Sequence, residues 1–269
     1  MRAKFFLLHA NVWVALCASS LCLSSSIVLN TYSFEIVFFV FNSTLFLYGF
    51  QRLIKTDYSK SHFRKQSVLK KWTLYILIIG SFFSAIYFCL GFQIKTLILA
   101  IIIGIISIIY PFYLRRIPKL KIYIISLAWA IITVLLLVIE NNIPFGLSVL
   151  LEFSSRFLFV FAITIPFDIR DINYDSNKLK TIPQLAGVLR AKTISLSSLC
   201  LFLIINIWQY YNADIILPHL LGILFVSIIS AILIYLSHPK KSNFFFGFWV
   251  EGLSILLFIA LLLANQFRY

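Results

Sequence analysis

The chain has 269 residues, of which 61% are hydrophobic and 12% charged, and its mean hydropathy is +0.99. These values exclude an ordinary soluble globular domain and indicate an integral membrane protein. The formal net charge of +14 could suggest a nucleic-acid partner, but the basic residues fall in alternate loops and do not form one polar face. The distribution of this charge therefore predicts the orientation of the chain in the membrane.

Nine apolar runs, each long enough to cross a hydrocarbon core of about 30 Å, recur along the chain. They are approximately 5–28, 33–52, 72–91, 95–113, 121–139, 144–167, 190–209, 214–236 and 244–266. The runs lack the alternation of barrel strands, and backbone groups in lipid must be satisfied within their own segment. The predicted fold is all-α, a single domain over 1–269 with nine transmembrane helices and no room for a separate soluble domain.

The first run could imitate a secretory signal peptide, because it follows a charged start and contains "ALCASS". His9 and Asn11 interrupt it and no soluble domain follows, so we interpret it as the first transmembrane helix. The four cysteines lie inside predicted spans without metal-ligand spacing, which favours small apolar fillers. They are Cys17, Cys22, Cys89 and Cys200.

Lysine and arginine are concentrated at the N-terminus and in the connections after the second, fourth, sixth and eighth runs. The intervening connections hold only Lys95, and the C-terminus holds only Arg268. By the positive-inside rule, the N-terminus is cytoplasmic and the C-terminus is outside, in what we expect to be a bacterial cytoplasmic membrane. The longer loops 53–71 and 168–189 then cap the bundle on the cytoplasmic side, where we expect the chemistry.

Polar residues inside the spans are informative because burying them costs free energy and their usual justification is function. Glu152 and Arg156 have the four-residue spacing of an intrahelical ion pair. The pair either fixes helix packing or lines a cavity. Glu251 and Asn42 fall in the cytoplasmic halves of their spans, and neither is diagnostic alone.

Three aspartates, Asp168, Asp171 and Asp175, follow the sixth run in "IPFDIRDINYDSNKLKTIPQLAG", residues 165–187. If the helix continues through them, their spacing places all three carboxylates on one face. Such a face suits Mg²⁺, and the surrounding basic residues would hold the remaining charge of a phosphate. The stretch is either local charge balance at a basic surface or a site for a diphosphate and its metal.

"IRDINYDSNKLKTIPQLAG" resembles the second aspartate motif of the UbiA-type intramembrane prenyltransferases. In that family an Arg–Asp pair, a second Asp four residues on and a Thr–Leu–Pro run ending in Gly follow the sixth helix. The matching residues are Arg170, Asp171, Asp175, Thr181, Pro183 and Gly187, with Ile182 in place of the usual Leu. "YPFYLRRIPKL", residues 110–120, is similar to the tyrosine and basic residues that the family places after its fourth helix, beside the diphosphate.

The resemblance implies a bundle with a lipid-open central cavity, in which Mg²⁺ holds a polyprenyl diphosphate and the prenyl group passes to a lipid-soluble acceptor, for example an aromatic one. It implies that Asp171 and Asp175 are catalytic through the metal, with Asp168 as a third ligand. The residues assigned to diphosphate binding are Arg170, Arg115, Arg116, Lys119, Tyr110, Arg52 and Asn42.

The first aspartate motif of the family is missing. The second helix normally carries Asn–Asp, with further aspartates three and seven positions after the first. Aligning Asn42 on that Asn places Ser43, Phe46 and Phe50 at the three aspartate positions.

Two explanations of this loss stay open. Either Arg52, Lys55 and other loop cations replace the lost metal, which preserves a one-metal transferase, or the chain has lost ionisation chemistry and is a prenyl-lipid-binding or scaffold protein. A small-solute transporter is disfavoured, because paired spans broken by Gly or Pro are not evident.

Overall fold

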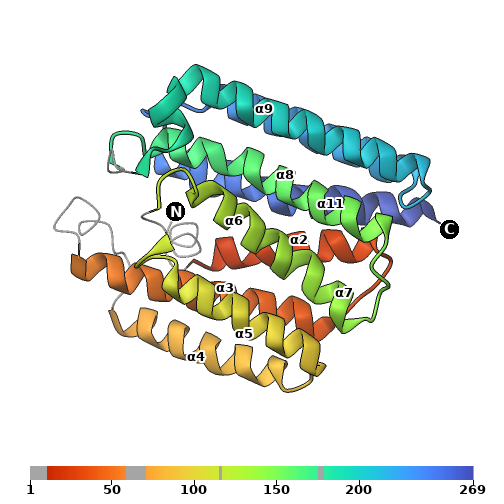
Figure 1. Ribbon diagram of the computed structural model, residues 1–269, viewed down its shortest axis with the longest axis horizontal. Helices are drawn as coiled ribbons and strands as arrows, with labels where there is room; N and C mark the ends of the chain where they lie inside the picture. The colour runs from red at the N-terminus through yellow and green to blue at the C-terminus, as the bar shows by residue number, and fades with distance from the viewer. Residues whose placement is uncertain (1–10, 59–70, 115–116, 175–178, 269) are drawn as a thin grey trace.

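The computed structural model describes residues 11–58, 71–114, 117–174 and 179–268, and within these ranges every regular element is a helix. Figure 1 shows the helices lying side by side in one bundle. In chain order they are α2 (Val12–Val28), α3 (Phe34–Tyr58), α4 (Lys71–Cys89), α5 (Ile94–Ile109), α6 (Lys121–Ala130), η3 (Ile131–Leu135), α7 (Leu136–Glu140), α8 (Leu147–Arg170), α9 (Ile182–Tyr211), α10 (Leu217–Leu236), η5 (Phe245–Val250), α11 (Glu251–Asn265) and η6 (Gln266–Arg268).

Seven helical segments are long and apolar enough to cross a membrane, and the helices Val12–Val28 and Ile94–Ile109 are shorter apolar ones. The segment α6–η3–α7 is one span, and η5 continues into α11. The prediction of an all-helical membrane bundle with nine apolar helices is confirmed for the described part of the chain.

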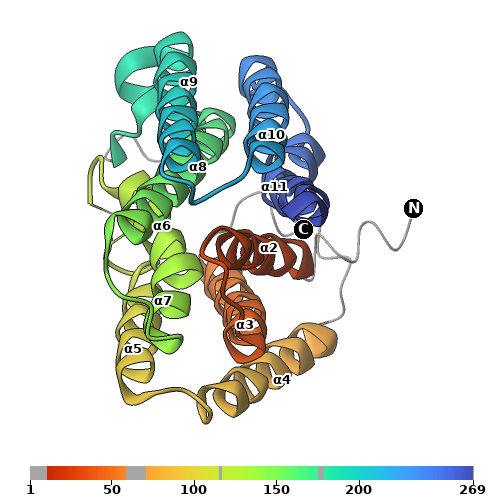
Figure 2. The same ribbon diagram turned by 90° about the vertical axis from the view of Figure 1, so that its right-hand side faces the viewer.

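The helices are arranged in two groups that meet at α2 (Figure 2). Apolar side chains of α8, α9, α10 and α11 form one core, which includes Phe159, Phe202, Ile223 and Leu253. A second core joins α2, α3, α5 and α7. Because α2 packs against both α3 and α11, it links the two groups.

Two segments of the bundle are π-helical, η3 and η5. Such insertions are rare and often occur at functional sites, since one extra residue per turn changes which side chains face the interior. η3 carries Thr133, and η5 ends directly before Glu251. Both therefore set the direction of polar side chains inside a membrane span.

α8 ends at Arg170, and Asp171 is its C-cap residue with φ −88° and ψ 4°. The expectation that one helix carries Asp168, Asp171 and Asp175 on a single face is therefore wrong. Asp and Asn side chains, as in the sequence after Arg170, compete with the helix for backbone hydrogen bonds and favour turns.

α9 begins within the loop predicted for 168–189. The backbone N–H of Thr181 donates to Gln184 Oε1 at 3.0 Å, and Pro183 lies in the first turn. Gly187, at φ +80° and ψ 163°, then interrupts the helix. Only glycine adopts this conformation readily, so a short first turn of α9 is set at an angle to the long span that follows.

Candidate functional site

The predicted site residues belong to the end of the bundle at which α8 ends and α9 begins, which we call the α8–α9 end. α3 and α5 also end there, and α6 and α11 begin there, at the left in Figure 1. The backbone N–H of Lys119 donates to the Leu179 carbonyl at 3.0 Å. This bond ties the connection between α5 and α6 to the residues that precede α9.

Asp168 is buried in the last turn of α8 and forms an ion pair with Lys121. The Lys121 Nζ lies 2.7 Å from Asp168 Oδ1, and their side chains are 12% and 2% exposed. A buried carboxylate is tolerated when a cation neutralises it. The pair therefore fastens the end of α8 to the start of α6.

Asp171 is held by the preceding residue, Arg170. Arg170 Nε donates to Asp171 Oδ1 at 2.7 Å, and its Nη2 donates to Oδ2 at 2.9 Å. The guanidinium also lies over the rings of Phe167 at 5.2 Å and Phe246 at 5.8 Å. A planar fork that binds a carboxylate in this way also matches the oxygens of a phosphate.

The described carboxylates do not form a metal site as they stand. Asp168 and Asp171 point to different cations, and no group of three or more His, Cys, Asp and Glu within the described ranges could hold a metal ion. Asp175 lies outside the described residues. The assignment of Asp168, Asp171 and Asp175 as metal ligands thus stays a prediction, and Asp171 would have to release Arg170 to take part in it.

The interior face of α3 is identified by Tyr48. A side-chain hydrogen bond joins Tyr48 to Trp129 of α6. The side of α3 that carries Tyr48 therefore faces α6.

Phe46 and Phe50 lie on the opposite side of α3. The Phe46 ring packs against Phe82 of α4, with centroids 5.1 Å apart, and it stacks with Phe50 at 6.0 Å. A shift of two residues turns a helix by about 200°. The alignment that placed Phe46 and Phe50 at aspartate positions of the motif therefore turns these two side chains toward α4, away from the side that carries Tyr48.

Moving the motif back by two residues puts Phe41, Thr44 and Tyr48 at the three aspartate positions. These side chains provide no carboxylate. The first aspartate motif is therefore absent in this shifted alignment as well.

The remaining predicted residues differ in their surroundings. Tyr110 is the C-cap residue of α5. Arg52 is half-buried one turn after Tyr48. Asn42 Nδ2 donates to the Phe38 carbonyl of its own helix at 2.8 Å. Arg115 and Arg116 lie outside the described residues, so the diphosphate-binding set stays a prediction.

Sequence reasoning gives no role in the site to four residues of this region: Lys121, Tyr48, Trp129 and Glu251. Glu251 is noted as an acid inside an apolar span, which is a functional signal, but it is not assigned to the site. Tyr48 and Trp129 could not be found, because the chain contains 13 tyrosines and 28 phenylalanines and aromatic residues are frequent in every span.

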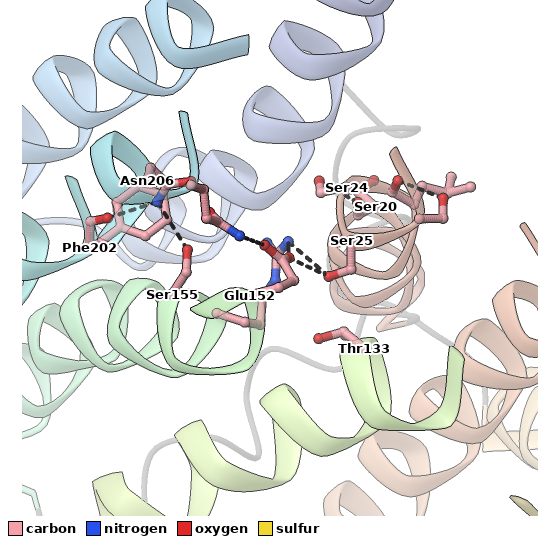
Figure 3. A network of polar contacts seen from close by, with 12 residues as sticks. Ser20, Ser24, Ser25, Thr133, Glu152, Ser155, Phe202 and Asn206 are labelled. Atoms are coloured by element: carbon pink, nitrogen blue, oxygen red, sulfur yellow. Dashed lines mark hydrogen bonds and ion pairs between the residues drawn. The ribbon is translucent and has the colours of Figure 1, made fainter. Parts of the chain in front are cut away.

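A second polar cluster surrounds Glu152, as Figure 3 shows. Glu152 belongs to the first half of α8, so the cluster lies farther from the α8–α9 end, and it contains the predicted pair of Glu152 and Arg156. Arg156 Nη2 and Ser25 Oγ each donate to Glu152 Oε1 at 2.8 Å, and Gln209 Nε2 lies 3.4 Å from Glu152 Oε2. Asn206 donates to Ser155 Oγ at 3.0 Å. The predicted ion pair is confirmed, and its partners on α2, α8 and α9 favour the role in helix packing.

Comparisons with known proteins place this arrangement among UbiA homologues by structure. No family model and no curated protein sequence matches the chain. A UbiA homologue from Aeropyrum pernix K1 superposes with a TM-score of 0.71 at 12% identity, over 96% of this chain and 98% of that chain.

Two further solved structures are similar to this chain over nearly its whole length. A UbiA homologue from Archaeoglobus fulgidus, solved with GPP and Mg²⁺, gives a TM-score of 0.64 at 14% identity over 98% of this chain and 99% of that chain. A digeranylgeranylglyceryl phosphate synthase gives 0.64 at 14% identity over 99% and 100%. At these identities the likeness establishes the fold and leaves the chemistry to the site. The chain has the UbiA fold over nearly its whole length.

Proposed function

We propose that this protein is a membrane prenyltransferase that binds a polyprenyl diphosphate at the α8–α9 end and passes the prenyl group to a lipid-soluble acceptor. The observation that carries the proposal is the Arg170–Asp171 fork at the end of α8, followed by the Pro183 turn and the Gly187 break of α9. This is the resemblance to the second aspartate motif, found in a bundle that shares the fold of a homologue solved with GPP and Mg²⁺. By the positive-inside rule, this end faces the cytoplasm.

Basic side chains would provide most of the electrostatic stabilisation of the diphosphate leaving group. When the C–O bond of the prenyl diphosphate breaks, its electron pair leaves with the diphosphate, and fixed positive charge stabilises that leaving group. Arg170 would offer its fork to phosphate oxygens, and Lys119 borders the same end. The prenyl carbon then bonds to a nucleophilic atom of the acceptor, which loses a proton.

Magnesium is part of the prediction, with Asp171, Asp175 and Asp168 as its ligands. Bound there, it would supply further positive charge to the diphosphate. The ion pairs of Asp168 and Asp171 do not fit this role in the described arrangement, so none of the steps above passes through a metal.

A second candidate is a protein that binds a prenyl lipid without turnover. Two observations favour it: Tyr48 and Thr44 stand on α3 where the first motif would have carboxylates, and Asp168 and Asp171 are each engaged by a cation. Binding would then use the same end of the bundle, without ionisation of the diphosphate.

The test uses the full chain reconstituted in lipid with geranyl diphosphate labelled in both the prenyl and the diphosphate groups. Diphosphate release and prenylated product are measured with and without Mg²⁺, in the presence of candidate aromatic and alcohol acceptors. The transferase releases diphosphate, and Asp171→Ala lowers the release, because Arg170 loses the carboxylate that orients its fork. Asp214→Asn is the matched control, because Asp214 bonds Ser148 at the opposite end of the bundle.

Tight binding without release would instead support the binding protein. A wild-type chain that neither binds nor ionises the diphosphate would overturn both candidates.

A further inference from the structure

α9 and α10 lie side by side at the edge of the bundle farthest from α4 (Figure 2). A groove of about 150 Å³ lies between them, lined by residues from Leu196 to Leu203 on α9 and from Ser227 to Ala231 on α10. The lining side chains are all apolar or small, and the Ser227 hydroxyl already donates to the Ile223 carbonyl at 2.8 Å. This α9–α10 groove therefore suits a hydrocarbon ligand.

The α9–α10 groove opens on the exposed surface of the two helices. Ile228 is 54% exposed and Cys200 is also exposed, whereas Leu199 is 3% exposed and packs into the core that α8, α9, α10 and α11 share. The exposed surface of a membrane span contacts lipid chains. A recess of this volume is too small for another helix, which is about 10 Å across with its side chains, and it fits part of an acyl chain.

Lys192 and Tyr235 border the groove at the α8–α9 end of the bundle. They lie four residues beyond Leu196 and Ala231, which is about one turn or 6 Å along each helix and keeps them on the side of the lining. Lys192 Nζ donates to the Tyr235 carbonyl at 2.6 Å and lies 5.5 Å from the centroid of the Tyr235 ring. This bond uses one of the three N–H donors of the ammonium group.

The positive charge of Lys192 is not neutralised by a carboxylate. Among the described residues no Asp or Glu forms an ion pair with it. Residues 176–213 and 215–250, which include the whole of α9 and α10, contain no Asp or Glu at all. Exposed basic residues lie near the same ends of the two helices, namely Arg190, Lys240 and Lys241. An anionic group at the head of the groove would therefore meet uncompensated positive charge.

We propose that the α9–α10 groove binds an anionic phospholipid, with one acyl chain between the two helices and the phosphate at Lys192. The apolar lining lies deeper in the membrane, and the tyrosine and the lysine lie at the level of the headgroups, which is the order of groups along a phospholipid. Basic pockets between transmembrane helices bind anionic headgroups on the cytoplasmic side, to which the positive-inside rule assigns this end. The lipid site does not depend on prenyl transfer.

A second apolar groove gives a comparison within the same molecule. It has a volume of about 280 Å³ and is formed by residues of η3 and of the start of α8, at the opposite end of the bundle. Its lining includes Phe145, Val149 and Leu150, and residues 122–155 contain no Lys or Arg. This groove is larger and equally apolar, so the bordering cation is what distinguishes the α9–α10 groove.

The test measures lipid binding to the full chain by native mass spectrometry, with phosphatidylglycerol as the anionic probe and phosphatidylcholine as the zwitterionic one. The wild-type chain should prefer phosphatidylglycerol. Lys192→Gln should lower the affinity for phosphatidylglycerol about fivefold, the contribution expected of one basic residue near an anionic headgroup, and should leave phosphatidylcholine unchanged. Lys192→Arg keeps the charge and should retain the preference.

A matched pair of tryptophan variants locates the acyl chain. Ile228→Trp fills the α9–α10 groove and should weaken phosphatidylglycerol binding by a few-fold, which tests the site even if Lys192→Gln does not fold. Leu150→Trp places the same ring in the second groove, at a leucine that is 61% exposed, and should leave the preference for phosphatidylglycerol unchanged.

The inference is overturned if the wild-type chain binds the two lipids equally, or if Lys192→Gln leaves phosphatidylglycerol affinity unchanged. Equal losses of both lipids in Lys192→Gln would also overturn it, since the lysine would then only cap the end of α10. Unchanged phosphatidylglycerol affinity in Ile228→Trp would show that no acyl chain occupies the groove. None of these results depends on geranyl diphosphate, so the proposed function is tested separately.

Discussion

Two acidic residues inside the bundle, Glu152 and Glu251, have opposite surroundings. Glu152 is 2% exposed and is satisfied by Arg156, Ser25 and Gln209. Glu251 is half-buried and has no hydrogen-bond or ion-pair partner within the described ranges. A carboxylate that the protein satisfies by itself holds helices together, whereas one that it leaves open is available to a ligand.

The largest effect expected is on stability, at the Glu152 cluster. Arg156→Met leaves Glu152 buried without its cation, which should lower the free energy of unfolding by about 3–5 kcal/mol. Unfolding by denaturing detergent in mixed micelles measures the change. In the double variant Glu152→Gln with Arg156→Met no charge remains, so most of the stability should return; a double variant as unstable as the single one would contradict this explanation.

Lys121→Met should destabilise the protein by a smaller amount, about 2–3 kcal/mol, because it removes the ion pair of the buried Asp168 at a position where Lys121 is partly exposed. The same unfolding titration applies. Asp168→Asn in the Lys121→Met background should recover stability. No loss in the single variant would show that water already screens Asp168.

Arg170→Lys keeps the positive charge and removes the planar fork. Affinity for geranyl diphosphate should fall by about tenfold, since one bidentate contact is replaced by a point charge. Equilibrium binding in nanodiscs measures the effect, with Lys192→Arg as a control because Lys192 bonds the Tyr235 carbonyl at the end of α10. Unchanged affinity would place the diphosphate elsewhere.

Gly187→Ala should cost about 1–3 kcal/mol, because the alanine must adopt a backbone conformation that is nearly exclusive to glycine. Gly80→Ala is the matched control, since a Cβ there would meet no atom within 4 Å and the φ of Gly80 is not positive. Equal stabilities of the two variants would show that the break in α9 relaxes without cost.

The fold could be predicted from the sequence, because the nine apolar runs and the second aspartate motif can be recognised without knowing where each side chain points. The prediction of the first motif failed, because it required knowing which side of α3 faces the interior. A helix turns by about 100° per residue, so a small error in register moved Phe46 and Phe50 from the α4 side to the interior.

The continuation of α8 past Arg170 failed for a different reason, which is the turn preference of Asp and Asn. The open position of Glu251 follows from packing: η5 precedes it, and α11 packs against α2. The hydrophobic periodicity of the sequence predicts neither the end of α8 nor the surroundings of Glu251.

The most direct test of the account is photo-crosslinking of a geranyl diphosphate analogue, with a diazirine near its first prenyl carbons, to the full chain in lipid. Mass spectrometry should find the label on peptides that contain Tyr48, Trp129 or Glu251, and unlabelled geranyl diphosphate should compete it away. Labelling that resists competition, or that falls on the α4 side at Phe46 and Phe82, would contradict the account.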